Sequence, residues 1–195
     1  MSNPGRLSFE QIPSLLHSFA REKTPRLTFR PLTLSDAEGL FAIMSDPEVS
    51  RYNRWETQTT LAETQSYIQA VIDLYDQGQY LEWGIFTADH TLIGFFGFIW
   101  WLPEFASAEI GFSLGQSYWG KGYMQEALKA LIDWGFKSME LNRFEAQCES
   151  RNLPSQKCLE KLGWFCEGLM RQKAFFKEEY HDIKLYSLLK SDPAF

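Results

Sequence analysis

Apolar residues recur along this chain with two periods, one typical of strands and the other of helices. Residues 26–30 alternate between polar and apolar positions and therefore predict a first strand. Two capping-box sequences, at residues 35–38 and 60–63, then precede apolar residues at helical spacing. We expect one helix that ends before Pro47 and a second that runs up to Gly78.

The middle of the chain has three strand-like segments followed by one long amphipathic segment. The predicted strands are residues 81–87, 92–101 and 107–114. Turn-forming residues separate them, so we expect an antiparallel meander. Apolar residues at helical spacing over 124–139 predict a long helix soon after the third strand.

The last part of the chain is predicted to hold one strand, a short helix and a final pair of strands. The strand covers residues 143–149, and the helix opens at Pro154 and closes at Gly163. The final strands cover residues 164–176 and 183–189, joined through 177–182. Strands and helices therefore both contribute throughout the chain.

Length and composition indicate one globular domain. A chain of 195 residues, 45% hydrophobic and 16% aromatic, is long enough for one sizeable core. We assign residues 1–24 to an N-terminal extension, 25–190 to the domain and 191–195 to a C-terminal tail. No apolar run reaches the roughly 18 residues of a membrane helix, and the N-terminus lacks a signal-peptide pattern. We therefore expect a soluble, cytoplasmic protein without membrane contact.

Charge and cysteine content exclude two further classes of function. The net charge of −6 argues against general nucleic-acid binding, which requires a basic face. Cys148, Cys158 and Cys166 form no C-x-x-C pair, and only three histidines are present. We therefore predict no metal site and interpret the three cysteines as reduced core thiols.

A glycine-bearing turn lies between the strand 107–114 and the helix 124–139. Such a turn presents unpaired N–H groups at a helix N-terminus, a site that binds phosphate. The P-loop NTPase pattern fits Gly115, Gly120 and Lys121, but Gly122 replaces its metal-binding Ser or Thr. The dinucleotide pattern fits less well, because Gln125 stands at its third glycine. Two other interpretations of this turn are possible: an ordinary glycine-rich connection, and a third type of phosphate loop with a Gly-x-Gly core.

That third pattern extends over most of the chain, which resembles the RimJ/RimL-type N-acetyltransferases of the GNAT family from about residue 26 to residue 189. Nine motifs in the family's order carry the resemblance. They are 26–30 (RLTFR), 108–112 (AEIGF), 118–123 (YWGKGY), 126–128 (EAL), 141–143 (LNR), Asn152 with Ser155, 160–164 (EKLGW), 167–168 (EG) and 180–182 (YHD).

The resemblance implies an α+β GNAT fold, with a central, mostly antiparallel, seven-stranded mixed sheet and helices on both faces. It also implies transfer of the acetyl group of acetyl-CoA, without a metal, to a primary amine by direct attack in a ternary complex. The acceptor is then a protein N-terminus or a small-molecule amine, and the protein a monomer or homodimer. A non-catalytic acetyl-CoA sensor is the first alternative, and a P-loop nucleotide-binding phosphotransferase is the second.

The resemblance also implies which residues hold acetyl-CoA. The pyrophosphate is expected on backbone N–H groups of the glycine turn, and the pantetheine arm beside the strand 107–114. Two residues of the short helix region are expected to contact the arm. The full set is Ile110, Phe112, Leu114, Trp119, Gly120, Lys121, Gly122, Tyr123, Met124, Asn152 and Ser155.

Two catalytic residues are predicted, Glu109 as base and Ser155 as acid. Alternation places Glu109 on the strand face opposite Ile110 and Phe112, so it can face a cleft. The resemblance implies its role as base and that of Ser155 as proton donor to the thiolate, since Leu159 occupies the place of the tyrosine used by many GNAT enzymes. A solvated carboxylate and a helix-capping hydroxyl are the respective alternatives.

Other aromatic and polar residues are predicted to be structural. An acceptor pocket can be shaped by Tyr118, Trp119, Trp83, Trp100 and Trp101, although strand aromatics usually fill a core. His181 lies in the final hairpin, where we predict a structural contact rather than a base.

Overall fold

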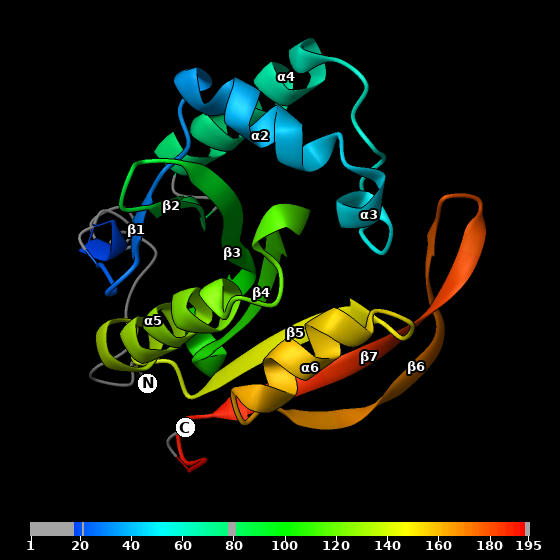
Figure 1. Cartoon of the computed structure of the whole chain (residues 1–195). Coiled ribbons are helices and arrows are strands. Elements are labelled where there is room, and N and C mark those ends of the chain that lie inside the picture. The colour runs from blue at the N-terminus through cyan, green and yellow to red at the C-terminus, as the bar shows by residue number, and fades with distance from the viewer. Residues whose placement is uncertain (1–17, 21, 78–80, 194–195) are drawn as a thin grey trace.

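A computed structural model describes residues 18–20, 22–77 and 81–193 (Figure 1). Its strands are β1 (Leu27–Arg30), β2 (Leu81–Thr87), β3 (Leu92–Leu102), β4 (Ser107–Leu114), β5 (Arg143–Glu149), β6 (Phe165–Phe176) and β7 (Glu179–Leu189). Its α-helices of four or more residues are α2 (Ala37–Met44), α3 (Pro47–Ser50), α4 (Leu61–Asp76), α5 (Tyr123–Ser138) and α6 (Leu153–Lys161). The seven strands form one mixed sheet in the order β1-β2-β3-β4-β5-β7-β6, which confirms the predicted fold class.

The sheet opens between its two central strands. β4 and β5 are the only parallel neighbours among the described strands, and they pair only at Ser107–Arg143, Ala108–Phe144 and Glu109–Glu145. Beyond Glu109 the two strands diverge, and Figure 1 shows β4 and β5 running apart. The remaining length of β4 therefore keeps one edge without a neighbouring strand of the described chain.

Helices cover both faces of the sheet, as predicted. Consecutive residues of β3 point to opposite faces: Phe96 packs in the cluster that contains Leu128 and Leu131 of α5. Phe95 packs instead with Leu40 of α2 and Ile68 of α4. Two apolar cores therefore lie on the two sides of one sheet. No described helix is long and apolar enough to cross a membrane.

The larger core includes a residue of the predicted N-terminal extension. Phe19 is fully buried, and its ring contacts four other aromatic rings. These are Phe29, Trp83, Phe96 and Trp134. Trp134 also donates its indole N–H to the Ser18 hydroxyl at 3.1 Å. A domain boundary at residue 25 stays a prediction, but core contacts begin before it.

The start of the first helix differs from the predicted capping box. A 3₁₀ turn, Leu34–Asp36, precedes α2, and Thr33 occupies the N-cap position predicted for Ser35. The Asp36 carboxylate accepts the Thr33 N–H at 2.8 Å and pairs with Arg30 at 2.6 Å. The ion pair with β1 is a tertiary contact, so the local pattern placed the cap two residues too late.

The final hairpin is longer than predicted. β6 and β7 are joined by a two-residue turn, Lys177 and Glu178, whose φ angles are 49° and 62°. A turn with both central residues at positive φ normally contains Asn or Gly, so this pair gave no turn signal. β7 therefore starts at Glu179 instead of residue 183.

The cysteines are free, but only two of them lie in the core. Cys148 and Cys158 are buried, and burial raises the pKa of each thiol to about 12. Cys166 is exposed on β6, so its predicted core position is wrong. β6 is an edge strand with mostly exposed side chains, whereas its sequence is rich in apolar residues.

Replacing Gly135 of α5 by alanine is expected to destabilise the fold by about 1–3 kcal/mol. A Cβ at this position would overlap the Phe144 ring and lie 3.3 Å from Leu141 Cδ1. Gly39→Ala in α2 is the matched control, because its Cβ would meet Leu92 at an ordinary 3.5 Å. Urea unfolding should show a loss only for Gly135→Ala; equal stabilities would contradict the packing argument.

Candidate active site

Two adjoining hollows occupy the opening between β4 and β5. The inner cavity, of about 370 Å³, lies over the sheet face that carries Glu109, Gly111 and Ser113. The outer groove, of about 710 Å³, lies between the N-terminal ends of α5 and α6. The two hollows share six lining residues: Tyr52, Asn53, Phe112, Ser113, Asn152 and Ser155. They therefore form one continuous cleft.

The glycine turn forms one wall of the outer groove. Gly120 and Gly122 have φ angles of 73° and 78°, in the left-handed region that glycine adopts without strain. Gly122 is the N-cap of α5 and has no side chain to cap the helix, so the first N–H groups of α5 lie at the groove. The positive end of this 16-residue helix therefore faces the groove.

The predicted cofactor residues lie along this cleft with one exception. Phe112, Leu114, Trp119, Gly120, Gly122, Tyr123, Met124, Asn152 and Ser155 line the outer groove, and Ile110 lines the inner cavity. Lys121 lines neither hollow, and its ammonium donates to the Ser117 carbonyl at 2.8 Å. Its side chain therefore braces the turn.

The open edge of β4 presents backbone groups to the cleft. Gly115 N–H donates to Ile93 O at 2.9 Å. Because hydrogen-bonded and non-bonded pairs alternate in an antiparallel ladder, Gly111 and Ser113 also bond to β3. The N–H and C=O groups of Phe112 and the C=O of Ile110 then point the other way, into the opening, whereas the Ile110 N–H belongs to the parallel pairing of Glu109 with Glu145 of β5. The Leu114 carbonyl is already bound by the Trp119 indole N–H at 2.6 Å.

Glu109 is buried at the point where β4 and β5 diverge. Its Oε2 accepts the indole N–H of Trp100 at 2.7 Å and the amide N–H of Gln147 at 3.1 Å. Burial raises the pKa of Glu109, and the nearby charge of Glu145 adds to this, whereas the two hydrogen bonds and Arg54 oppose it. A buried carboxyl with a raised pKa is suited to accept a proton near neutral pH.

A β-bulge brings Trp100 to Glu109. The register of β3 against β4 passes from Phe98–Ile110 to Trp100–Glu109, so Ile99 is left unpaired. Without this extra residue, Ile99 would lie opposite Glu109. Of the aromatic residues considered for an acceptor pocket, Trp100 therefore contacts Glu109 through its N–H, whereas Trp83 is fully buried in the core.

Ser155 lies at the start of α6 between the two hollows. The Asn152 side chain caps this helix by accepting the Ser155 N–H at 3.2 Å. Asn152 thus takes the capping role that was the alternative for the Ser155 hydroxyl. The Ser155 side chain is half-buried.

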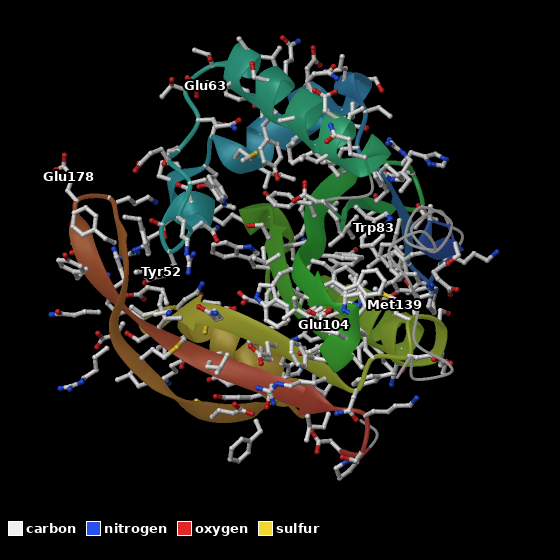
Figure 2. All side chains as sticks on the ribbon, turned by 180° about the vertical axis from the view of Figure 1, so that it is seen from behind. Tyr52, Glu63, Trp83, Glu104, Met139 and Glu178 are labelled. Carbon is white, nitrogen blue, oxygen red and sulfur yellow. The ribbon has the colours of Figure 1, made fainter. Side chains whose placement is uncertain are left out.

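Several residues of the cleft carried no functional prediction. Tyr52, Asn53, Arg54 and Trp55, on the aromatic and basic connection after α3, line the inner cavity. Figure 2 shows Tyr52 on this connection and Glu178 at the tip of the β6–β7 hairpin, on the same side of the molecule. The aromatic and basic composition of this connection could have marked it in the sequence as part of a site. Its position over the sheet, however, depends on tertiary packing.

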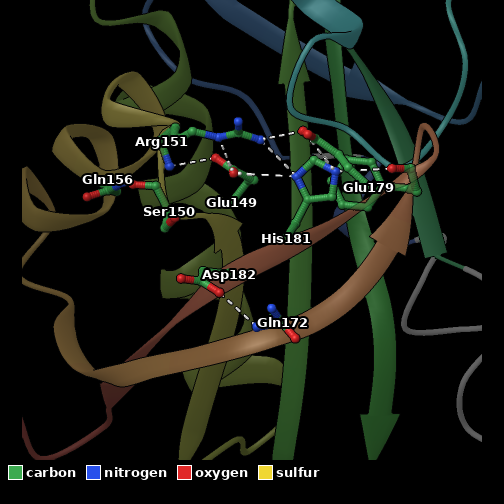
Figure 3. A network of polar contacts seen from close by, with 9 residues as sticks. Glu149, Ser150, Arg151, Gln156, Gln172, Glu179, His181 and Asp182 are labelled. Carbon is green, nitrogen blue, oxygen red and sulfur yellow. Dashed lines mark hydrogen bonds and ion pairs between the residues drawn. The ribbon is translucent and has the colours of Figure 1, made fainter.

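A polar network supports the loop between β5 and α6 (Figure 3). Buried Glu149 accepts the side-chain Nε of Arg151 at 2.6 Å and its backbone N–H at 2.5 Å. Arg151 donates to His181 Nδ1 at 3.0 Å, and His181 Nε2 donates to the Phe176 carbonyl at 3.1 Å. The His181 ring also stacks on Phe176 with centroids 3.6 Å apart. His181 is therefore a structural contact, as predicted.

Comparison with known proteins identifies the family. A model described as "Acetyltransferase (GNAT) domain" matches residues 26–164. N-acetyltransferase p20 of Bacillus licheniformis, an uncharacterised protein, is 40% identical over 88% of this chain and 97% of its own length. The ribosomal-protein-serine acetyltransferase of Escherichia coli is 34% identical over 64% of this chain and 69% of its own length.

The same fold occurs in a solved acetyltransferase bound to coenzyme A. RimL, the ribosomal L7/L12 α-N-protein acetyltransferase, superimposes with a TM-score of 0.76, covering 85% of this chain and 95% of RimL at 24% sequence identity. The family match, the relatives and the shared fold agree with the geometry of the cleft. This chain belongs to the GNAT family of acetyl-CoA-dependent N-acetyltransferases and is of the RimJ/RimL-like type.

Proposed function

We propose that this enzyme acetylates a primary amine, preferably an α-amine at a peptide N-terminus, by direct attack on acetyl-CoA in the cleft. One observation carries the proposal. The phosphate-binding features of the outer groove and the buried carboxyl of the inner cavity belong to one continuous cleft, and Ser155 borders both hollows. Cytoplasmic location and a monomeric or homodimeric state are part of the proposal.

The residues present fit acetyl-CoA. The N–H groups at the start of α5 are suited to the diphosphate, since they combine unpaired donors with the positive end of a helix dipole. The outward N–H and C=O groups of Phe112 and the C=O of Ile110 are suited to the amide-bearing pantetheine arm, which would lie along β4 as an added strand. Asn152 and Ser155 line the opposite side of the groove.

Glu109 and Ser155 account for the proton movements of the transfer. The thioester of acetyl-CoA supplies an activated acetyl group. The acceptor nitrogen forms a bond to the acetyl carbon while the carbon–sulfur bond breaks. Glu109 accepts one proton from the nitrogen, directly or through a water, and then releases it to solvent, whereas the Ser155 hydroxyl gives a proton to the departing sulfur and is reprotonated from solvent, so that no net proton is consumed.

An α-amine suits a carboxylate base. Its pKa of about 8 leaves part of it neutral at pH 7, whereas a lysine amine near 10.4 needs a stronger base. The names of the E. coli relative and of RimL point to protein acceptors for those enzymes. A thiol-release assay with N-terminal peptides, polyamines and aminoglycosides tests this preference. Turnover of the amines but not the peptides would contradict it, and no turnover would favour the sensor.

Saturating acetyl-CoA is expected to raise the melting temperature by about 5–10 °C. A ligand at 100 times its Kd adds about 2.7 kcal/mol of stability, and each kcal/mol shifts the transition of a protein this size by about 2–4 °C. Magnesium-ATP should have no such effect, because Gly122 replaces the Ser or Thr of the P-loop pattern. Thermal unfolding with each ligand measures this, and stabilisation by magnesium-ATP alone would overturn the proposal.

A further inference from the structure

Arg26 connects the first strand to the glycine turn of the outer groove. It stands immediately before β1, 95 residues away from Lys121 in the sequence. Its guanidinium donates through Nη1 to the Lys121 carbonyl at 3.0 Å and through Nε to the Glu126 carboxylate at 2.6 Å. It also stacks over the Tyr123 ring, 4.4 Å from the ring centroid.

The Glu126 carboxylate fixes this arginine from the first turn of α5. Besides the guanidinium, it accepts the Arg26 backbone N–H at 3.0 Å and the Thr24 hydroxyl at 2.5 Å. These hydrogen bonds together with the charge of Arg26 lower the pKa of Glu126, although partial burial opposes them. The carboxylate therefore stays ionised at neutral pH, and the pair of side chains has no net charge.

The contact with the Lys121 carbonyl orients the next backbone N–H. In a trans peptide the C=O and the following N–H point in opposite directions. The chain has no cis peptide among the described residues, so the Gly122 N–H points away from Arg26. Gly122 lines the outer groove, and a Cβ built on it would lie 3.6 Å from Arg26 Nη2. Gly122 is therefore in contact with both Arg26 and the groove.

We propose that Arg26 is a positioning residue for the diphosphate of acetyl-CoA: it holds the 121–122 peptide so that the Gly122 N–H faces the ligand. This inference rests on the proposed function, which places the diphosphate at this turn. Glycine at positions 120 and 122 allows the turn many backbone conformations, and the hydrogen bond from Arg26 to the Lys121 carbonyl restricts them from outside the turn. Arg26 acts through Gly122 and need not touch the ligand.

Loss of the brace is expected to weaken coenzyme A binding by about tenfold. The interaction that becomes misaligned is the hydrogen bond from the Gly122 N–H to the charged diphosphate. Loss of such a bond usually weakens binding by roughly tenfold or more. The kcat at saturating acetyl-CoA should change by less than about threefold, because Arg26 does not line the inner cavity that contains Glu109. A general loss of folding would instead lower kcat and binding together.

The chain provides a closely matched control in Arg30. Its side chain is 43% exposed against 45% for Arg26, and each arginine has an ion pair at 2.6 Å. Arg30 stacks on Phe86 at 3.9 Å, as Arg26 stacks on Tyr123. Arg30 contacts Asp36 and not the glycine turn. Arg30→Gln therefore removes the same kinds of interaction at a distance from the proposed ligand.

The test is the Kd of coenzyme A, measured by calorimetry for wild type, Arg26→Gln, Arg26→Lys and Arg30→Gln, with inorganic pyrophosphate as competitor. We expect about tenfold weaker binding for Arg26→Gln and a change within twofold for Arg30→Gln. Arg26→Lys keeps the charge but not the forked donor, so it should also bind more weakly than wild type. It serves as the second variant if Arg26→Gln fails to fold.

The outcomes separate this inference from the proposed function. If pyrophosphate competes in wild type but both Arg26 variants bind coenzyme A within twofold of wild type, the positioning role is wrong and the proposed site stands. If wild type binds coenzyme A without competition from pyrophosphate, the diphosphate lies elsewhere and the placement fails irrespective of Arg26. Equal weakening in Arg30→Gln would show a stability effect and would also overturn the inference.

Discussion

Glu109→Gln is expected to lower kcat by about 10²- to 10⁴-fold, the usual contribution of a positioned general base. The amide has nearly the same shape and still fits the cavity, but it cannot accept the proton of the attacking amine. The Trp100 and Gln147 donors bind Oε2 of the carboxylate, so Oε1 is the oxygen that remains to face the acceptor. Coenzyme A binding should be unchanged, because Glu109 lies in the inner cavity and not in the outer groove.

The pH profile gives a second readout of the same residue. The base must be deprotonated to act, so kcat/KM of the wild type should rise with pH through the pKa of Glu109. Burial raises this pKa, so this first rise of kcat/KM should occur at a higher pH than the titration of an ordinary glutamate. Titration of the acceptor amine contributes a further rise at higher pH. Glu109→Gln should lose the rise of kcat/KM at lower pH, which is due to Glu109, and keep the rise at higher pH, which is due to the acceptor amine.

Glu145→Gln is the control for this prediction. Glu145 lies opposite Glu109 in the short parallel pairing of β4 and β5, and its charge helps to raise the Glu109 pKa. Its removal should shift the rise of kcat/KM that is due to Glu109 slightly to lower pH, and it should change kcat by less than about threefold. A kcat of Glu109→Gln that equals that of wild type would remove this residue from the mechanism, and ordered water would then be the base.

Sequence patterns within a single strand, turn or helix predicted those parts of the site whose geometry is set within that one element. Period-two alternation placed Glu109 on the face of β4 away from the buried Ile110, and the structure confirms this face. The glycine turn and the helix after it were also predicted from contiguous residues. Their local geometry, with positive φ at Gly120 and Gly122, is what glycine at those positions allows.

Features that depend on pairing between elements were not predictable in this way. Gln147 reaches Glu109 because β5 lies beside β4, and Trp100 reaches it because a bulge shifts the register of β3. Arg26 belongs to a motif that supported the family resemblance, yet its contact with the Lys121 carbonyl spans 95 residues. A single sequence contains no local signal for such contacts.

Phe19 illustrates the same limit at the start of the chain. An apolar residue such as Phe19, in a segment that also contains proline and glycine, gives no local signal that its side chain enters the core. In the structure its ring fills the space between β1, β2, β3 and α5, against Phe29, Trp83, Phe96 and Trp134. The segment before residue 25 thus contributes to the same core that supports β4 from behind.

Phe19→Ala is expected to lower the free energy of unfolding by about 3–5 kcal/mol, the usual cost of removing a buried phenylalanine ring. The four surrounding rings are held by strands and a helix, so they cannot collapse fully into the space that is left. Phe165→Ala on β6 removes the same ring where it is 69% exposed, and it should change stability by about 0.5 kcal/mol or less.

Urea unfolding of the three proteins, followed by tryptophan fluorescence, measures this difference. Trp83 and Trp134 contact Phe19 directly, so their emission should report the local change as well as the transition. A shifted midpoint with an unchanged slope would indicate a pure loss of packing. A Phe19→Ala protein as stable as Phe165→Ala would show that the N-terminal segment is dispensable for the core, and the domain would then begin at residue 25 as the sequence predicts. The expected loss instead makes residues before β1 part of the folded unit that contains the cleft.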